Sequence, residues 1–177
     1  MNGKAIHCVL VKTIPNVYVA GVFPKDEIPK NFPSYPACLV ANTDFASDPG
    51  EHWVALYFPN ARLCEFFDSF GGPPSAYDIS IDVPKIQYSN VKLQSDTTTV
   101  CGHYCIYFLL RRCLRRESLF TIGHQLDIMH TNSTRDPFIL NFIRNLRSSI
   151  RRQAPCTSKA NCPISQCCTS KIHWCEK

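Results

Sequence analysis

Short runs of apolar residues, several of them alternating with polar ones, dominate the first half of the chain. Such runs are typical of β-strands, especially where Val, Ile, Phe and Tyr are frequent. A Pro-Asn-Ala-Arg segment lies between two of the runs and predicts a hairpin that joins them. The last run would place Gln94 directly after the end of a strand. We predict strands over residues 17–23, 37–41, 52–58, 63–67 and 86–93.

The second half of the chain changes to helical spacing. An apolar segment from Val100 to Arg115 predicts a helix, with Thr98 or Thr99 as its N-cap. A last helix is predicted to begin with Asp136 as N-cap and Pro137 as its first residue. We expect the apolar face of this last helix to be core; it consists of Phe138, Ile139, Phe142, Ile143, Leu146 and Ile150.

The composition fits a compact domain. The chain has 177 residues, of which 45% are hydrophobic and 11% aromatic, enough for a sizeable core and too apolar for disorder. No run reaches the length of a transmembrane span, and residues 1–11 lack a signal-peptide cleavage pattern. Six of the eleven cysteines lie singly in apolar contexts, which favours a reduced interior. We therefore expect an intracellular protein, in the nucleus, the cytoplasm or a virus-like particle, without a membrane partner.

Residues 93–105 are the most informative segment for function. Gln94 stands seven residues before a Cys101-Gly102 pair, and this pair opens the predicted helix. The first turn of a helix has unpaired N–H groups and the positive end of the helix dipole, so a cysteine there is favoured as thiolate. We expect Gly102 to leave room for a substrate backbone to approach closely.

Two residues upstream complete a set of side chains for nucleophilic catalysis. His52 and Asp68 each lie beside aromatic residues at a predicted strand end. A thiol nucleophile needs a general base, a carboxylate that orients the base, and donors for the oxyanion. His52 would be the base and Asp68 the orienting carboxylate. The Gln94 amide and the backbone N–H of Cys101 would bind the oxyanion, and the whole set predicts a cysteine peptidase.

Taken singly, each of these residues also has a purely structural explanation. Cysteine is among the most buried residue types, and we expect Cys105 and Cys113 to lie on the buried face of the same helix. Asp68 precedes a Gly-Gly-Pro-Pro segment, as the first residue of a turn often does. Trp53 either shapes a pocket beside the base or is a buried aromatic at a strand start. Only the combination of residues and spacings favours catalysis.

Three blocks of the chain resemble the adenovirus-type cysteine proteases. They are GEHWVALY at residues 50–57, EFFDSFG at residues 65–71, and a glutamine followed by CGHYC within residues 94–105. The chain is most similar to the branch encoded by Polinton (Maverick) elements, which are virus-like DNA transposons of eukaryotes. The resemblance extends from about residue 17 to residue 152.

This resemblance implies an α+β, papain-like fold in permuted order, with a central, mostly antiparallel sheet packed against the helix that carries the nucleophile. It implies the same roles for His52, Asp68, Gln94 and Cys101. The adenovirus enzymes have a glutamate at the position of Asp68, whereas the clan that includes the SUMO-deconjugating peptidases has an aspartate. That clan usually places an aspartate directly before the Cys-Gly pair, where this chain has Val100. The departure favours maturation of virus-like precursor proteins over isopeptide cleavage.

Two basic clusters account for much of the net charge of +5. Each is either a solvated helix face or a surface for non-specific binding to DNA phosphates. The resemblance adds DNA and a basic peptide as candidate activators, because adenovirus proteases are stimulated by both. The attachment site of such a peptide aligns near Val83, and the absence of a cysteine between Cys64 and Cys101 argues against a disulfide-linked activator. The clusters are Arg111, Arg112, Arg115 and Arg116, and Arg144, Arg147, Arg151 and Arg152.

We predict a protease domain over residues 1–152 and a cysteine-rich tail over residues 153–177. Thiolates and an imidazole in the tail are zinc-ligand types, but their spacings fit no common zinc motif. We therefore expect a poorly ordered extension, no metal, no required cofactor and a monomer that acts on protein substrates. The tail residues concerned are Cys156, Cys162, Cys167, Cys168, His173 and Cys175.

Two alternative functions remain open from the sequence. A peptidase that deconjugates ubiquitin-like proteins would have the same catalytic set, although a short chain offers little surface to grip such a substrate. A catalytically inactive, transposon-derived binding module is the second alternative. The presence of all four catalytic residue types argues against decay of the site.

Overall fold

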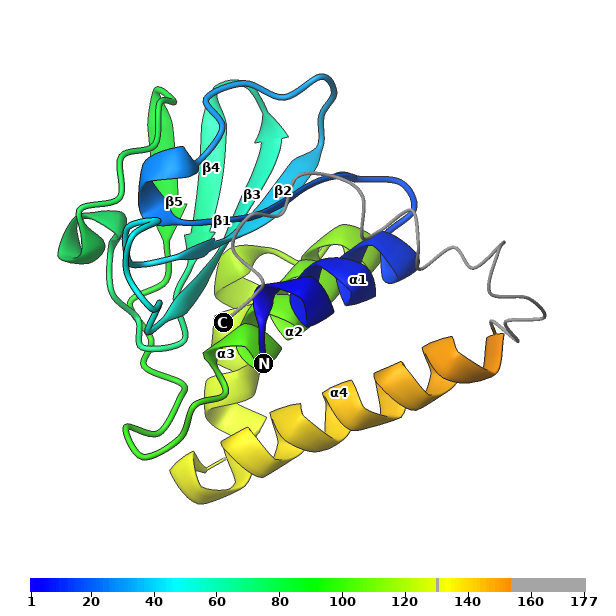
Figure 1. Ribbon diagram of the computed structural model, residues 1–177. Helices are drawn as coiled ribbons and strands as arrows, with labels where there is room; N and C mark the ends of the chain where they lie inside the picture. Colours follow the sequence, from blue (N-terminus) through cyan, green and yellow to red (C-terminus); the bar gives the residue numbers. More distant parts are fainter. Residues whose placement is uncertain (130, 154–177) are drawn as a thin grey trace.

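The computed structural model describes residues 1–129 and 131–153 (Figure 1). The predicted cysteine-rich tail, apart from Gln153, lies outside the described residues. The strands are β1 (Tyr18–Phe23), β2 (Ala37–Asn42), β3 (Trp53–Asn60), β4 (Leu63–Phe67) and β5 (Lys85–Tyr88). The α-helices are α1 (Gly3–Thr13), α2 (Cys101–Arg115), α3 (Leu119–Met129) and α4 (Asn132–Gln153).

The strands form one mixed sheet in the order β1-β2-β3-β4-β5. The predicted hairpin between β3 and β4 is present, and β2 also pairs with β3 in antiparallel fashion. The two outer pairs, β1 with β2 and β4 with β5, are parallel. The α+β class is thus confirmed, but the mostly antiparallel sheet that we predicted is wrong. The reason is that residues 24–36 and 68–84 are long connections that return the chain to the same end of the sheet.

Both faces of the sheet are covered. Helices α1 and α2 lie side by side against one face (Figure 1). Residues 28–35 and 74–83, from the two long connections, contribute apolar side chains to a second cluster that includes residues of β2, β3 and β4. Every residue of β2 is consequently buried, which explains why this strand is a continuous apolar run rather than an alternating one.

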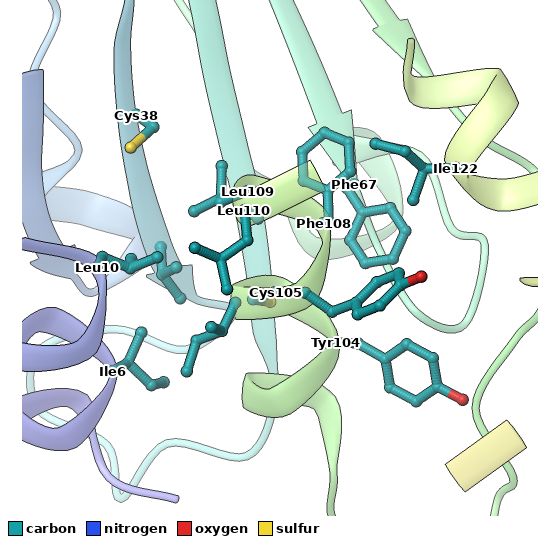
Figure 2. Close-up of a cluster of buried hydrophobic side chains, with 14 of the residues drawn as sticks. Ile6, Leu10, Cys38, Phe67, Tyr104, Cys105, Phe108, Leu109, Leu110 and Ile122 are labelled. Carbon is teal, nitrogen blue, oxygen red and sulfur yellow. The ribbon is translucent and has the colours of Figure 1, made fainter. Parts of the chain in front are cut away.

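Helix α2 is the central helix of the structure. It packs against β3 and is contacted by α1, α3 and α4. Figure 2 shows side chains of α1, including Ile6 and Leu10, close to the helix that carries Cys105 and Phe108. The rings of Phe67 and Phe108 stack with their centroids 4.6 Å apart. Because α2 is surrounded, most of its circumference is apolar and its N-terminus is fixed by packing on several sides.

The start of α2 differs from our prediction. Neither Thr98 nor Thr99 caps the helix; Val100 occupies the cap position, and no side chain accepts a hydrogen bond there. The Thr98 hydroxyl donates instead to the Asp136 carboxylate at 2.6 Å. The N–H groups of the first turn, beside Cys101, are therefore not taken up by a side-chain cap.

Helix α4 begins at Asn132, one turn before the predicted Asp136–Pro137 start. The carbonyl oxygen of Thr131 accepts from the amides of Thr134 and Arg135 at 3.0 Å each, which closes the first turn. Pro137 thus lies inside the helix, where it lacks one backbone donor. Asp136 does not cap α4, because its buried carboxylate accepts hydrogen bonds from residues outside the helix.

Three further parts of the fold differ from the prediction. Strand β5 ends at Tyr88, so the predicted strand over residues 86–93 is too long and Gln94 lies in an irregular loop. Helices α1 and α3 were not predicted. The β-branched apolar residues of α1 are typical of strands, yet Asn2 caps it as a helix by accepting from the amide of Ala5 at 3.0 Å.

Two arginines of the first basic cluster are engaged in ion pairs. Arg112 donates to Glu65 at 2.6 and 2.9 Å, and Arg111 donates to Glu117 at 2.6 and 2.8 Å. Carboxylates thus already bond both guanidinium groups. DNA binding stays a prediction for the whole set of arginines, of which Arg115, Arg116, Arg144, Arg147, Arg151 and Arg152 are exposed.

Among the helices of residues 1–129 and 131–153, none is both long enough and apolar enough to cross a membrane.

The ion pair between Arg112 and Glu65 links α2 to β4 and gives a test of the fold. The side chains are only 16% and 7% exposed, so we expect Glu65→Ala to leave an unpaired buried charge. It should lower the free energy of unfolding by about 3–5 kcal/mol. The matched control is Asp96→Ala, because the Lys92–Asp96 pair is 54% and 74% exposed and should lose about 0.5 kcal/mol or less. Urea denaturation of both variants measures the difference, and equal losses would contradict a buried pair.

Candidate active site

His52 and Asp68 lie at adjacent ends of two paired strands. His52 directly precedes β3 and Asp68 directly follows β4, and the antiparallel pairing of Ala55 with Phe67 brings them together. The Nε2 atom of His52 lies 2.6 Å from Oδ1 of Asp68. This contact leaves Nδ1 as the imidazole nitrogen that is available for a second partner.

The Asp68 carboxylate is fully buried and accepts four hydrogen bonds. Besides His52, Oδ1 accepts from the amide of Phe70 at 3.0 Å. Oδ2 accepts from the amide of Gly72 at 2.7 Å and from the Tyr77 hydroxyl at 2.6 Å. Burial alone would raise the pKa of Asp68, but the hydrogen bonds from His52, Tyr77 and Phe70 outweigh it and hold the pKa below its ordinary value. Asp68 is therefore a carboxylate at neutral pH.

The Cys101 side chain, at the first residue of α2, interacts with the His52 imidazole. Burial would raise the pKa of Cys101, but the interaction with His52 and the charge of its ring lower it, as do the backbone amides of Trp53 and Gly102. Burial would lower the pKa of His52, yet the contacts with Asp68 and Cys101 raise it to about 9. These opposite shifts favour a thiolate–imidazolium pair at neutral pH.

Cys101 differs in this respect from other buried cysteines of the same domain. All six cysteines in the described part of the chain are free thiols. Burial raises the pKa of Cys64 and of Cys105, which therefore remain thiols. Cys101 is the one among these three whose surroundings favour the nucleophilic form.

The His52 ring is flanked by two aromatic rings. The centroids of Phe70 and Tyr77 lie 4.9 and 5.7 Å from that of the imidazole. Burial and the Asp68 carboxylate raise the pKa of Tyr77, so its hydroxyl stays protonated and donates. Sequence analysis missed Tyr77, whose only signal was an aromatic residue shortly after the Gly-Gly-Pro-Pro segment. The short 3₁₀ helix Pro74–Tyr77 positions it beneath the carboxylate.

Gln94 is buried, and its side-chain amide has a fixed orientation. Oε1 accepts from the Ser69 hydroxyl at 2.8 Å, and Nε2 donates to the carbonyl oxygen of Thr98 at 2.6 Å. An amide nitrogen carries two hydrogens, so one N–H of Gln94 is left for another acceptor. Thr98 is three residues before Cys101, which brings the amide to the N-terminal end of α2. Ser69, which orients the amide, had no signal in the sequence.

A close approach of two loops connects Gln94 to Asp68. Gly71 has φ +78°, and a Cβ atom there would lie 2.9 Å from the backbone of Asn90. The carbonyl oxygen of Ser69 accepts from the amide of Gln94 at 2.9 Å. The turn after Asp68 therefore packs directly against the segment that leads to Gln94.

Trp53 and Gly102 both lie against the core at the start of α2. A Cβ atom on Gly102 would lie 3.0 Å from Cδ1 of Ile6 and 3.4 Å from Cδ1 of Trp53. Gly102 thus allows the close approach of Ile6 of α1, and its role toward a substrate stays a prediction. Trp53 is half-buried against the core, and its carbonyl oxygen accepts from Sγ of Cys105 at 3.3 Å. Its position fits an aromatic residue at a strand start.

A cavity of about 330 Å³ opens beside the base, next to His52, Phe70 and Tyr77. A second cavity of about 530 Å³ shares the lining residues Lys25 and Asp78 with the first one. In residues 1–129 and 131–153, no group of three or more His, Cys, Asp or Glu side chains is placed to hold a metal ion.

The chain is distantly homologous to a viral cysteine protease. It is 29% identical over 89 residues to the cysteine protease S273R of African swine fever virus, in a match that covers 41% of this chain and 32% of that protein. Two crystal structures of the pS273R protease of that virus give TM-scores of 0.39 and 0.45, at 24% and 17% identity. These matches cover 58% and 71% of this chain, and 42% and 59% of the solved chains.

The chain thus spans less than two thirds of the length of the viral protease and of these two solved chains. No protein-family model matches the chain. The resemblance to the Polinton branch stays a prediction.

The paired pKa shifts predict an unusual pH profile for the alkylation of Cys101. His52 is protonated below a pKa of about 9, and the imidazolium keeps Cys101 ionised as the pH falls. We expect the rate with iodoacetamide to fall less between about pH 8 and about pH 6 than that of an ordinary thiol, which loses about tenfold per unit. Peptide mapping by mass spectrometry would compare Cys101 with Cys8, which is partly exposed on α1.

His52→Ala is the control for this profile. Without the imidazole, burial dominates, so Cys101 should react slowly at neutral pH and faster as the pH rises. If the profile of Cys101 in the wild type parallels that of Cys8, Cys101 and His52 do not form an ion pair.

Proposed function

We propose that this chain is a cysteine endopeptidase in which Cys101 is the nucleophile and His52 the general base and acid. One observation carries the proposal. The thiol interacts with an imidazole whose Nε2 atom is 2.6 Å from a fully buried carboxylate. This is the nucleophile–base–orienter relation required for acyl transfer by a thiol. The distant homology to a viral cysteine protease supports the same activity.

In the acylation step, the Cys101 thiolate attacks the carbonyl carbon of the scissile peptide bond, and a C–S bond forms. The electron pair of the carbonyl π-bond moves to the oxygen, which becomes an oxyanion. Collapse of this intermediate breaks the C–N bond, and the imidazolium of His52 transfers its Nδ1 proton to the leaving amine. The product is a thioester on Cys101.

In the deacylation step, neutral His52 takes a proton from water, and the hydroxide formed attacks the thioester carbonyl. The C–S bond breaks and returns the electron pair to sulfur, so the thiolate–imidazolium pair is restored and the acid product leaves. Asp68 keeps Nε2 protonated throughout and stabilises the positive imidazolium. Tyr77, Phe70 and Gly72 hold that carboxylate in place.

The oxyanion is stabilised in both steps by two donors in this proposal. One is the free N–H of the Gln94 amide, whose orientation Ser69 and Thr98 fix. The other is the backbone N–H of Cys101, at the positive end of the α2 dipole. A preorganised donor pair needs no reorientation when the charge develops.

For the biological role, we propose the maturation of virus-like precursor proteins by a peptidase of Polinton-like origin. The support is the viral source of the homologous protease and the order His, Asp, Gln, Cys, with the glutamine seven positions before the cysteine. Deconjugation of a ubiquitin-like protein is the alternative with the same chemistry. An inactive binding module is the alternative that lacks peptidase chemistry. The interactions among His52, Asp68 and Cys101 disfavour that alternative.

Substrate cleavage separates these functions. Wild type, Cys101→Ala and the control Cys113→Ala would be compared under reducing conditions, on peptides with small-residue Gly-x-Gly sites and on ubiquitin-like Gly-Gly fusions. We expect wild type and the control to cleave the peptides, and Cys101→Ala to lose at least about 10³-fold in rate because it lacks the nucleophile. Cleavage of the fusions alone would favour deconjugation. If wild type cleaves neither substrate and Cys101 titrates as an ordinary thiol, the inactive module is favoured.

The role of Gln94 gives a separate prediction. Gln94→Ala should lower kcat by about 10²–10³-fold, because one oxyanion donor is lost. The iodoacetamide rate of Cys101 should be unchanged, because displacement of iodide at a saturated carbon forms no oxyanion. Steady-state kinetics and alkylation of the same preparations check both statements, and a normal kcat would remove Gln94 from the oxyanion hole.

A further inference from the structure

The segment that carries Gln94 has no regular secondary structure of its own. Residues 89–100 connect β5 to α2 without a helix or a strand, although the Gln94 side chain within them is buried. Catalysis at an oxyanion requires the donor to be held to within a fraction of an ångström. The position of Gln94 must therefore be set by contacts from other elements. We call residues 92–98 the oxyanion loop.

Asp136 of α4 bonds the oxyanion loop on the C-terminal side of Gln94. Its Oδ2 atom accepts from the Thr98 hydroxyl at 2.6 Å and from the amide of Ser95 at 3.3 Å. Its Oδ1 atom accepts from the hydroxyl of Tyr104 at 2.7 Å. Tyr104 lies on α2, one turn after Cys101. A single carboxylate thus joins the oxyanion loop to the helix of the nucleophile.

Arg135 bonds the oxyanion loop on the N-terminal side of Gln94. Its Nη1 atom donates to the carbonyl oxygen of Leu93 at 3.0 Å and to that of Lys92 at 3.4 Å. Its Nε atom donates to the carbonyl oxygen of Leu126 at 3.0 Å, which anchors the guanidinium to α3. Two neighbouring residues of α4 therefore bond the loop on both sides of Gln94.

Burial of these two charges is energetically unfavourable unless they are well bonded. Arg135 is 2% exposed and Asp136 is 3% exposed. Removing such groups from water costs several kcal/mol for each ion, and two apolar residues would fill the same space at lower cost. In this structure the compensating bonds of both residues include groups of the oxyanion loop. Their arrangement fits a role in positioning that loop better than a role in core packing.

We propose that Asp136, assisted by Arg135, is a positioning residue for the oxyanion hole: it fixes the Gln94 amide relative to Cys101 through Thr98 and Tyr104. The proposal rests on the proposed function. The Thr98 carbonyl that accepts from Gln94 belongs to the residue whose hydroxyl donates to Asp136. Loss of the carboxylate releases Thr98, and the remaining N–H of Gln94 loses its direction. Thiolate formation at Cys101 depends on His52 and is not affected.

The first test uses two variants of different severity. Asp136→Asn removes the charge, and Thr98→Val removes only the hydroxyl at nearly constant volume, so it keeps the test valid if the first variant folds poorly. Thr99→Val is the matched control, because Thr99 is exposed next to Thr98. We expect Asp136→Asn and Thr98→Val to lower kcat by about 10–10²-fold with KM changed less than about twofold. The iodoacetamide rate at Cys101 should stay at the wild-type value in all three variants.

The double variant Thr98→Val/Gln94→Ala tests whether Thr98 acts through Gln94. If it does, the double variant should have the kcat of Gln94→Ala alone, because residues that act as a unit are not additive. Multiplicative losses would overturn the proposal. A parallel fall of kcat and of the alkylation rate would also overturn it, since this pattern indicates general damage to the fold.

A measurement on the loop itself separates this proposal from the proposed function. The Gln94 side-chain amide proton that bonds the Thr98 carbonyl should be protected from exchange in wild type and in Thr99→Val, and should exchange at least about tenfold faster in Thr98→Val. NMR would monitor this exchange. Unchanged protection in Thr98→Val would overturn the positioning role whether or not the chain cleaves a substrate. Absence of cleavage by wild type, with the expected exchange pattern, would overturn the proposed function and leave the positioning of Gln94 by Asp136 standing.

Discussion

The hydrogen bonding of one buried charge, the Asp68 carboxylate, determines the geometry of the whole site. Four donors surround it, and only one of them is the imidazole. The other three come from residues 70–77, so a loop and a 3₁₀ helix are ordered around the carboxylate before any substrate is present. Because the imidazole is bonded through Nε2, its Nδ1 atom is the one that reaches the thiol. The charge of Asp68 therefore fixes both the tautomer of His52 and the atom that accepts the proton of Cys101.

The hydrophobic core performs the corresponding task for the nucleophile. Cys101 is the first residue of a helix that is enclosed by the sheet and three other helices, so the packing of α2 sets the position of its sulfur atom. Gly102 extends this coupling to α1, since Ile6 occupies the space that a side chain at residue 102 would take. Core stability and catalytic geometry are thus expected to respond together to substitutions on α1.

Local patterns in the sequence predicted strands β1 to β4, the helix of Cys101, and the residues His52, Asp68, Gln94 and Cys101 that the fold assembles into one region. Each of these has a signal within a few neighbouring residues, such as a Cys-Gly pair before an apolar helix. The parallel strand pairs, Ser69, Tyr77 and the buried role of Asp136 could not be predicted in the same way. They depend on contacts between residues far apart in the chain, and Asp136 next to a proline even has the local features of an ordinary N-cap. Tertiary hydrogen bonds to Ser95, Thr98 and Tyr104 override that preference.

The hydrogen bond from the Gln94 side chain to the Thr98 carbonyl has a consequence for how this protein can vary. Irregular surface loops usually accept insertions and deletions. Here the acceptor lies four residues after the donor, so one added or missing residue would present a different carbonyl to the amide and shift the Thr98 hydroxyl away from α4. The segment from Gln94 to Cys101 should consequently have constant length among related proteins even where its amino acids differ. Invariant length without invariant sequence would distinguish it from the longer connections, residues 24–36 and 68–84.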